Sequence, residues 1–222
     1  MKPFSKYFDH TLLKADATEA EIMKLCREAA EYSFASVCVN GSNVAMCAEA
    51  LQNSDVKVAA VVGFPLGAMS KDVKVFEAAR AIKEGASEID TVINIGNLKD
   101  GKYDTIVSEL KELADICHRE KALLKIIIET CLLTHDEKIK ACKLVTESGA
   151  DFIKTSTGFS TGGATVDDIK LMASNIGPNV SIKASGGIRT LEDAQRFIDA
   201  GASRLGCSAS VSIMKSKTAT TL

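Results

Sequence analysis

Short apolar segments and amphipathic segments alternate along the whole of this chain. Each segment of strand character is followed by one of helical periodicity, and the strand segments are residues 8–13, 36–39, 58–62, 88–93, 123–128, 152–157, 181–184 and 204–208. Strands that alternate with helices are typical of parallel βα units, and eight such units close into a barrel. We therefore predict a single (β/α)8 TIM barrel, with an active site at the C-terminal ends of the strands.

The helical segments carry start and stop signals. A capping box, in which a threonine is followed three residues later by an acidic residue, precedes helices at Thr18 with Glu21, Thr134 with Glu137, Thr165 with Asp168, and Thr190 with Asp193. Glycines that would end a helix lie before three of the strands, at Gly85, Gly149 and Gly201. The other main helices are predicted at about 42–51, 70–84 and 104–119.

An open, doubly wound sheet is the alternative architecture, but no G-x-G-x-x-G motif opens a helix after the first strand. That first strand has the least support of the eight, because Asp9, His10 and Thr11 are polar. No linker or charged block divides the 222 residues, so we predict one domain over 1–222. Its polar end, 215–222, is expected to be flexible.

Composition limits the partners that this chain is expected to bind. Its formal charge is -2, with 25% charged and 46% hydrophobic residues. A balanced charge provides no basic surface for nucleic acid, and no apolar run is long enough to span a membrane. We therefore expect a small-molecule substrate, with neither nucleic acid nor a membrane as partner.

The cysteines and histidines bear on localisation and metal binding. The seven cysteines form no C-x-x-C pair, and residues 1–8 lack the apolar core of a signal peptide. These features favour reduced thiols and a cytoplasmic protein. The three histidines are far apart in the sequence, so nothing local indicates a metal site, and we predict none.

A lysine lies at the centre of the predicted strand 152–157. Phe152 and Ile153 precede Lys154, and small polar residues follow it as far as Gly158. This pattern describes a strand that leaves an apolar interior and opens onto a site. Desolvation would lower the pKa of Lys154, and a neutral amine is a nucleophile towards carbonyl groups. The alternative is a lysine at the strand edge that extends its ammonium group into water.

Residues two apart on a strand share a face, and this period identifies more interior charges. On four consecutive strands the more apolar face suits the helix layer, which leaves four charged residues for the barrel interior: Asp90, Lys125, Lys154 and Lys183. Lys154 and Lys183 would lie on adjacent strands, where each ammonium disfavours the other, so one should be neutral at pH 7. Asp90 could compensate the remaining charge and transfer protons. A purely structural network of aspartate and lysines is the alternative reading.

Glycine-rich segments follow the last strands. Ser185 to Thr190, with Gly186 and Gly187, lies between a strand and a capped helix, where backbone N–H groups can hold a phosphate. The last strand ends in Gly206-Cys207-Ser208, and barrels often build a phosphate site from the loops after strands seven and eight. Gly158 could add a third wall. Such glycines alone can equally indicate tight turns.

Taken together, these blocks resemble the deoxyribose-phosphate aldolases, a family of class I, Schiff-base aldolases. The resemblance extends over nearly the whole chain, and its blocks are residues 9–13, 58–65, 88–90, 124–130, 152–158 and 183–189. It implies reversible cleavage of 2-deoxy-D-ribose 5-phosphate to acetaldehyde and D-glyceraldehyde 3-phosphate, in deoxyribose phosphate catabolism. It also implies a metal-independent reaction without a cofactor, and a homodimer or higher homo-oligomer.

The resemblance further implies roles for individual residues. Lys154 would form the Schiff base, while Asp90 and Lys183 would handle protons. The residues expected to bind the substrate and its phosphate are Gly158, Gly186, Gly187, Gly206 and Ser208. Those expected to line or brace the pocket are Asp9, Cys38, Lys125 and Thr155.

Two other functions are also compatible with this sequence, and one feature departs from the family pattern. The chain could be a Schiff-base aldolase for another phosphorylated sugar, or a barrel that binds a phosphorylated ligand without turnover. Members often end in a tyrosine that assists proton transfer, whereas this chain has Tyr only at 7, 32 and 103. The resemblance then implies reduced activity or a proton route through water.

Overall fold

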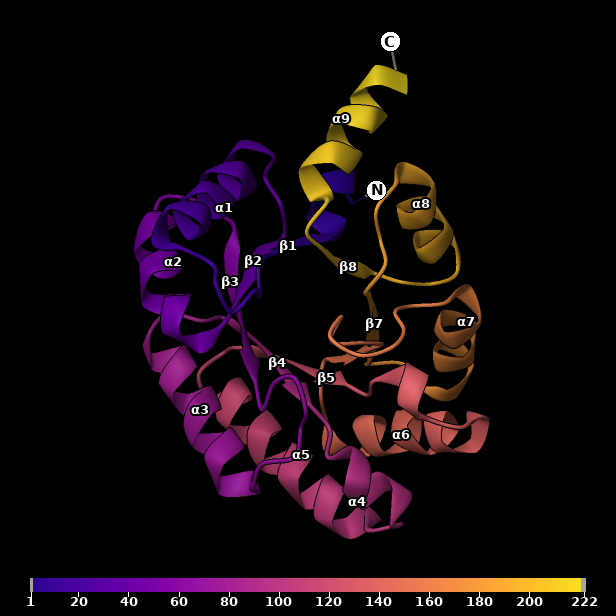
Figure 1. Ribbon diagram of the computed structural model, residues 1–222. Helices are drawn as coiled ribbons and strands as arrows, with labels where there is room; N and C mark the ends of the chain where they lie inside the picture. The colour runs from indigo at the N-terminus through magenta and orange to yellow at the C-terminus, as the bar shows by residue number, and fades with distance from the viewer. Residues whose placement is uncertain (1, 221–222) are drawn as a thin grey trace.

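The computed structural model describes residues 2–220, and its centre is a closed barrel of parallel strands (Figure 1). Each strand pairs with the next in sequence, and the last pairs with the first to close the barrel. The strands are β1 (Phe8–Thr11), β2 (Ser36–Val39), β3 (Lys57–Val62), β4 (Glu88–Val92), β5 (Leu123–Ile127), β6 (Phe152–Lys154), β7 (Ser181–Ser185) and β8 (Arg204–Cys207). The predicted (β/α)8 fold is confirmed.

Helices surround the barrel in the order of the chain (Figure 1). They are α1 (Glu19–Glu31), α2 (Val44–Ala50), α3 (Lys71–Lys83), α4 (Ile95–Lys99), α5 (Tyr103–Arg119), α6 (His135–Ser148), α7 (Val166–Asn175), α8 (Leu191–Asp199) and α9 (Ser210–Thr220). Short 3-10 helices add η1 (Phe4–Tyr7), η2 (Gly41–Asn43) and η3 (Thr130–Leu132). The sequence pattern missed η1, α4 and η3, which are too short to show helical periodicity.

Three of the four predicted capping boxes form, at the starts of α1, α6 and α8. At α7, the Thr165 hydroxyl accepts the N–H of Asp168 without the reciprocal contact. At α1, the Thr18 hydroxyl accepts the backbone N–H of Glu21 at 3.4 Å, while the Glu21 carboxylate accepts the N–H of Thr18 at 2.8 Å. These contacts satisfy backbone donors that the first turn of a helix leaves free. At the other end of α6, Gly149 adopts a φ of 80°, a left-handed conformation that favours glycine.

The core of the molecule lies between the sheet and the helices. The outward side chains of the strands, such as Ile89, Ile126 and Ile153, are fully buried in one apolar cluster with residues of α1 to α9. A second, small apolar cluster forms part of the barrel interior, and it consists of Leu13, Cys38, Ala59 and Val61. Charged side chains occupy much of the rest of the interior, beside buried apolar residues such as Val92 and Ile127. Charge in this position is unusual because barrel interiors are dominated by branched apolar side chains.

The ends of several strands and of the chain differ from the sequence-based boundaries, and among the strands β6 differs most. β6 ends at Lys154, so residues 155–158 already belong to the loop that follows it. The segment 215–222, expected to be a flexible tail, is helical as far as Thr220, and 221–222 lie outside the described residues. Within 2–220, the structure contains no helix with the length and apolar character of a membrane span.

Candidate active site

Lys154 is the last residue of β6, and its side chain is only 3% exposed. It lies in the wall of a cavity of about 250 Å³ at the C-terminal ends of the strands. The cavity is lined by Thr11, Leu12, Leu13, Lys14, Lys154, Thr157, Gly158, Phe159, Ser185, Gly186, Gly206, Cys207 and Ser208. A buried lysine therefore contacts a space that a small molecule can enter.

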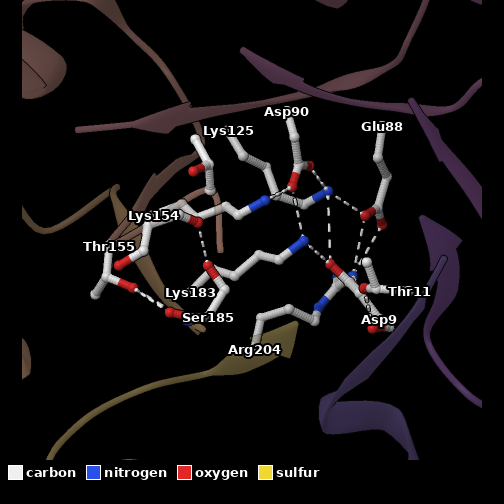
Figure 2. Close-up of polar contacts among 12 residues, drawn as sticks. Asp9, Thr11, Glu88, Asp90, Lys125, Lys154, Thr155, Lys183, Ser185 and Arg204 are labelled. Carbon is white, nitrogen blue, oxygen red and sulfur yellow. Dashed lines mark hydrogen bonds and ion pairs between the residues drawn. The ribbon is translucent and has the colours of Figure 1, made fainter. Parts of the chain in front are cut away.

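Three lysines surround the carboxylate of Asp90 inside the barrel (Figure 2). Its Oδ2 accepts hydrogen bonds from the Nζ of Lys154 at 2.8 Å and from the Nζ of Lys183 at 2.7 Å. Its Oδ1 accepts a hydrogen bond from the Nζ of Lys125 at 2.7 Å. The strand register explains this convergence, because Lys154 pairs with Lys183 across β6 and β7, and Asp90 pairs with Lys125 across β4 and β5. The interior position predicted for these four residues is confirmed.

The network continues toward the N-terminal ends of the strands through residues that sequence analysis did not assign to it. Arg204 donates to Asp9 at 2.6 Å and to Glu88 at 3.0 Å, and Glu88 also binds Lys125 at 2.5 Å. Asp9 forms a short ion pair with Lys183. A signal for Glu88 was present, since it lies two residues before Asp90 and therefore shares its strand face.

The surroundings of the lysines shift their pKa values in opposite directions. Burial lowers the pKa of Lys154, and the Lys183 ammonium adds to this effect against the opposing charge of Asp90. Burial alone would also lower the pKa of Lys183, but the carboxylates of Asp9 and Asp90 outweigh it and raise that pKa. Lys154 is thus the lysine favoured to lose its proton, while Lys183 stays an ammonium. Desolvation, more than the neighbouring cation, lowers the pKa of Lys154.

The predicted phosphate-binding residues fall into two groups. Gly158, Gly186, Gly206 and Ser208 line the cavity, whereas Gly187 is exposed and does not. Gly206 also makes room for the network, because a Cβ at this position would lie 3.0 Å from Cε of Lys183.

The four residues predicted to line or brace the pocket do not line the cavity. Asp9, Cys38, Lys125 and Thr155 are each fully buried. Asp9 and Lys125 belong to the charged network, and Cys38 packs in the apolar cluster of the interior. The Thr155 hydroxyl accepts the backbone N–H of Ser185 and donates to its carbonyl, both at 3.1 Å, which fastens β7 to the loop after Lys154. Their contacts are those of bracing residues.

Two charged residues of the cavity region were missed by sequence analysis. Lys14 lies in the cavity wall after β1, where its exposed ammonium group adds positive charge. Glu129 follows β5 with a φ of 51° and is buried, and its carboxylate accepts the backbone N–H and the hydroxyl of Thr157. Thr157 itself lines the cavity, so Glu129 fixes part of the wall. No local pattern marks either residue, because both lie in loops.

Comparison with known proteins identifies the family. The sequence model described as "DeoC/LacD family aldolase" matches residues 4–212. The chain belongs to the DeoC/LacD family of aldolases. Within this family, it is 59% identical over 210 residues to a deoxyribose-phosphate aldolase of Alkaliphilus oremlandii, a match that covers 95% of this chain and 94% of the relative. It is 55% identical over 215 residues to one of Geobacillus sp., covering 97% and 96% of the two chains.

A solved structure agrees with this membership of the DeoC/LacD aldolases. The chain superposes on the deoxyribose phosphate aldolase of Aeropyrum pernix with a TM-score of 0.91 and 30% identity, covering 98% of this chain and 92% of the other. That protein is described as tetrameric. In the part of this DeoC/LacD aldolase that the structure describes, no three or more His, Cys, Asp or Glu residues are grouped to hold a metal ion.

Proposed function

We propose that this protein is a deoxyribose-phosphate aldolase that cleaves 2-deoxy-D-ribose 5-phosphate reversibly to acetaldehyde and D-glyceraldehyde 3-phosphate. One observation carries the proposal. The amine of Lys154 borders the cavity, its pKa is lowered by burial, and its hydrogen-bond partner Asp90 is shared with the Lys183 ammonium. A buried, neutral amine beside a retained proton donor is what Schiff-base chemistry requires.

In the first step, the Lys154 nitrogen would attack the aldehyde carbon C1 of the open-chain sugar. A C–N bond forms, the carbonyl oxygen leaves as water after protonation, and a protonated imine remains. Lys183 is suited to donate protons in this step, because it stays an ammonium while lying against the same Asp90 oxygen as Lys154.

In the second step, the C3 hydroxyl would lose its proton as the C2–C3 bond breaks. The bonding electrons move into C1–C2 and onto the imine nitrogen, which gives an enamine and releases D-glyceraldehyde 3-phosphate. Protonation of C2 and hydrolysis of the imine then give acetaldehyde and free Lys154. Asp90 Oδ2 links Lys154 and Lys183, and this shared oxygen supports a role for Asp90 in transferring protons between them.

The substrate phosphate would lie at the outer part of the cavity. Gly186 follows β7 and Ser208 follows β8, and both line the cavity with Gly158 and Gly206. Backbone N–H groups and the Ser208 hydroxyl can donate to phosphate oxygens there. Lys14 would add the cation, while Gly187, outside the cavity wall, would support the shape of the turn.

Assembly and localisation complete the proposal. A homo-oligomer is supported by the tetramer described for the Aeropyrum pernix relative and by the exposed side chains of Leu66, Val73 and Phe76. A cytoplasmic location is supported by seven free cysteines, which suit a reducing compartment. Sedimentation equilibrium and cell fractionation test these two points.

The decisive experiment is borohydride reduction in the presence of acetaldehyde, followed by peptide mass mapping. We expect one ethyl group on Lys154, no such adduct without acetaldehyde, and no turnover by the Lys154→Leu variant. An unmodified Lys154 in an active enzyme would refute the proposed mechanism. Assays with deoxyribose 5-phosphate and with fructose phosphates then test the substrate, since a preference for fructose phosphates would make the protein another Schiff-base aldolase.

A further inference from the structure

A second cavity lies at the opposite end of the barrel from Lys154. Its volume is about 440 Å³, and it is lined by the first residues of four strands, which are Lys57, Glu88, Leu123 and Arg204. Because the strands are parallel, these residues mark the N-terminal face of the barrel. Chemistry in barrels of this kind takes place at the other face, so the mechanism proposed above does not use this cavity.

Basic residues predominate in the lining of this cavity. They are Lys2, Lys6, Lys57, Lys121 and Arg204, and the acidic residues are Asp55 and Glu88. Asp55 pairs with Lys6 at 2.6 Å, and Glu88 pairs with Arg204 at 3.0 Å. Among residues 2–220, no acidic side chain forms an ion pair with the other three lysines. The cavity therefore carries a surplus of positive charge.

The contacts of Lys2 support this description of the cavity. Its ammonium group donates to the carbonyl of Ser203 at 2.8 Å and lies 4.4 Å from the centre of the Tyr7 ring, so it is held against the cavity wall. Burial and the Arg204 guanidinium lower the pKa of Lys2, with Asp9 and Glu88 opposing. A cation held close to another cation favours an anion beside both.

Arg204 forms the floor of the cavity and has hydrogen-bond donors to spare. It is 9% exposed, and its Nη1 makes the bonds to both Asp9 and Glu88. Its Nη2 makes no hydrogen bond to another protein group within the described residues, whereas its Nε, also without a partner, is buried out of contact with solvent. A guanidinium group presents five donors in a planar fork that matches phosphate oxygens. Arg204 can therefore hold an anion without releasing the carboxylates of the network.

We infer that this cavity on the N-terminal face is a binding site for a small phosphate-bearing anion. The exposed Lys2, Lys57 and Lys121 attract the anion, and the buried Arg204 binds it at the base. Phosphate fits this donor set better than a monovalent anion, because several cations converge on one ligand that carries multiple charges and several acceptor oxygens. Arg204 also binds Asp9, which pairs with Lys183, so the bound anion lies next to the charged network of the interior.

Calorimetric titration with inorganic pyrophosphate at low ionic strength tests the inference. Pyrophosphate can also enter the catalytic cavity, so the variants decide the location. Lys57→Gln/Lys121→Gln removes two exposed cations of the rim, and Lys143→Gln/Lys170→Gln removes two exposed lysines of α6 and α7 as a control of equal charge. We expect the rim variant to bind about tenfold more weakly than the control. Equal affinities, or no binding by the wild type, would overturn the inference.

Chemical footprinting locates the bound anion independently of affinity. Lysine acetylation followed by peptide mass mapping should show that pyrophosphate protects Lys57 and Lys121 and leaves Lys143 and Lys170 reactive. Uniform reactivity with and without pyrophosphate would contradict the site even if the protein bound the anion elsewhere. Both measurements are independent of turnover, so their outcome does not depend on whether the proposed aldolase reaction is correct.

Discussion

Lys154 and Lys183 face each other across β6 and β7, and both donate to a single oxygen of Asp90, at 2.8 Å and 2.7 Å. Two ammonium groups that share one carboxylate oxygen repel each other, and the fully desolvated surroundings strengthen this repulsion. The carboxylate of Asp9 contacts Lys183, and no ion pair joins it to Lys154 among the described residues. The asymmetry decides which of the two lysines gives up its proton.

The charge balance of the whole network leads to the same assignment. Among the residues that the structure describes, the basic members of this network are Lys125, Lys154, Lys183 and Arg204, and its acidic members are Asp9, Glu88 and Asp90. Four full positive charges against three negative ones would leave a net charge in a buried volume, which is strongly unfavourable. Loss of one proton from Lys154 makes the network neutral. The neutral, nucleophilic amine of Lys154 is thus a consequence of the one basic group that the network has in excess.

We expect Lys183→Leu to move the catalytic pH profile to higher pH. Without the Lys183 ammonium, Asp90 acts on Lys154 with less opposition, so the pKa of Lys154 rises. The neutral fraction at pH 7 then falls about tenfold for each unit of that rise. Reductive ethylation rates measured between pH 6 and pH 10 would report the shift.

Lys143→Leu is the matched control for this variant, because it removes the same charge from an exposed site on α6. Its pH profile should coincide with that of the wild type. If Lys183→Leu also gave the wild-type profile while circular dichroism showed a folded barrel, Lys183 would have no part in activating Lys154.

The stability of the fold should decrease in acid because of the interior carboxylates. Although burial alone would raise the pKa values of Asp9 and Asp90, the surrounding cations hold them below the ordinary value. A carboxyl group whose pKa is lowered in the folded state stabilises the fold fully above its unfolded pKa, about 3.9, and loses this contribution as the pH falls below that value. Urea unfolding at pH 6, 4.5 and 3 measures the decline.

The Asp9→Asn variant separates this effect from general acid sensitivity. It should be less stable at pH 6 by about 3–5 kcal/mol, because Lys183 and Arg204 lose a buried partner. Its stability should then depend less on pH below 4 than that of the wild type. The exposed Asp115→Asn variant should retain the wild-type dependence, and an equal acid dependence in all three proteins would contradict the assignment to Asp9.

The fold and the centre of the site were predictable because both depend on periodic signals. Strand and helix periods gave the eight βα units, and the period of two gave the common face of Asp90 and Lys125. Arg204 was not assigned to the network, because whether a charged residue at the start of a strand faces the interior depends on how the barrel closes. The pairing of β8 with β1 brings Arg204 to Asp9, 195 residues away in the chain.

Loop residues were the least predictable part of the site. Lys14 and Glu129 reach the cavity region through loop conformations that no period describes, and Glu129 does so with a left-handed backbone. The end of β6 was predicted too late for a related reason, because local sequence does not separate a strand end from a loop. Thr155 and the residues after it have small polar side chains, which fit a strand end and a loop equally well.

Gly206→Ala should lower the turnover rate with a modest effect on stability. The added Cβ would lie 3.0 Å from Cε of Lys183 and 3.2 Å from Cβ of Ser185, so the Lys183 side chain must shift by a few tenths of an ångström. Overpacking of this kind destabilises by about 1–3 kcal/mol. Because a displacement of about 1 Å can reduce the rate about a hundredfold, this smaller shift should reduce it by roughly tenfold or less. In the control Gly41→Ala, the new Cβ meets no atom within 4 Å, and unchanged kinetics are expected.

Lys14→Gln should weaken the use of phosphorylated substrate selectively. Lys14 lines the cavity with Gly186 and Ser208, so its ammonium group lies where the substrate phosphate would bind. Loss of one exposed charge contact should raise the KM for 2-deoxyribose 5-phosphate about tenfold and leave kcat/KM for unphosphorylated 2-deoxyribose unchanged. Lys24→Gln on α1 is the control. Since salt screens exposed charges, the difference in the effect of the variant on the two substrates should shrink as ionic strength rises. Equal losses of kcat/KM for both substrates would place the phosphate elsewhere.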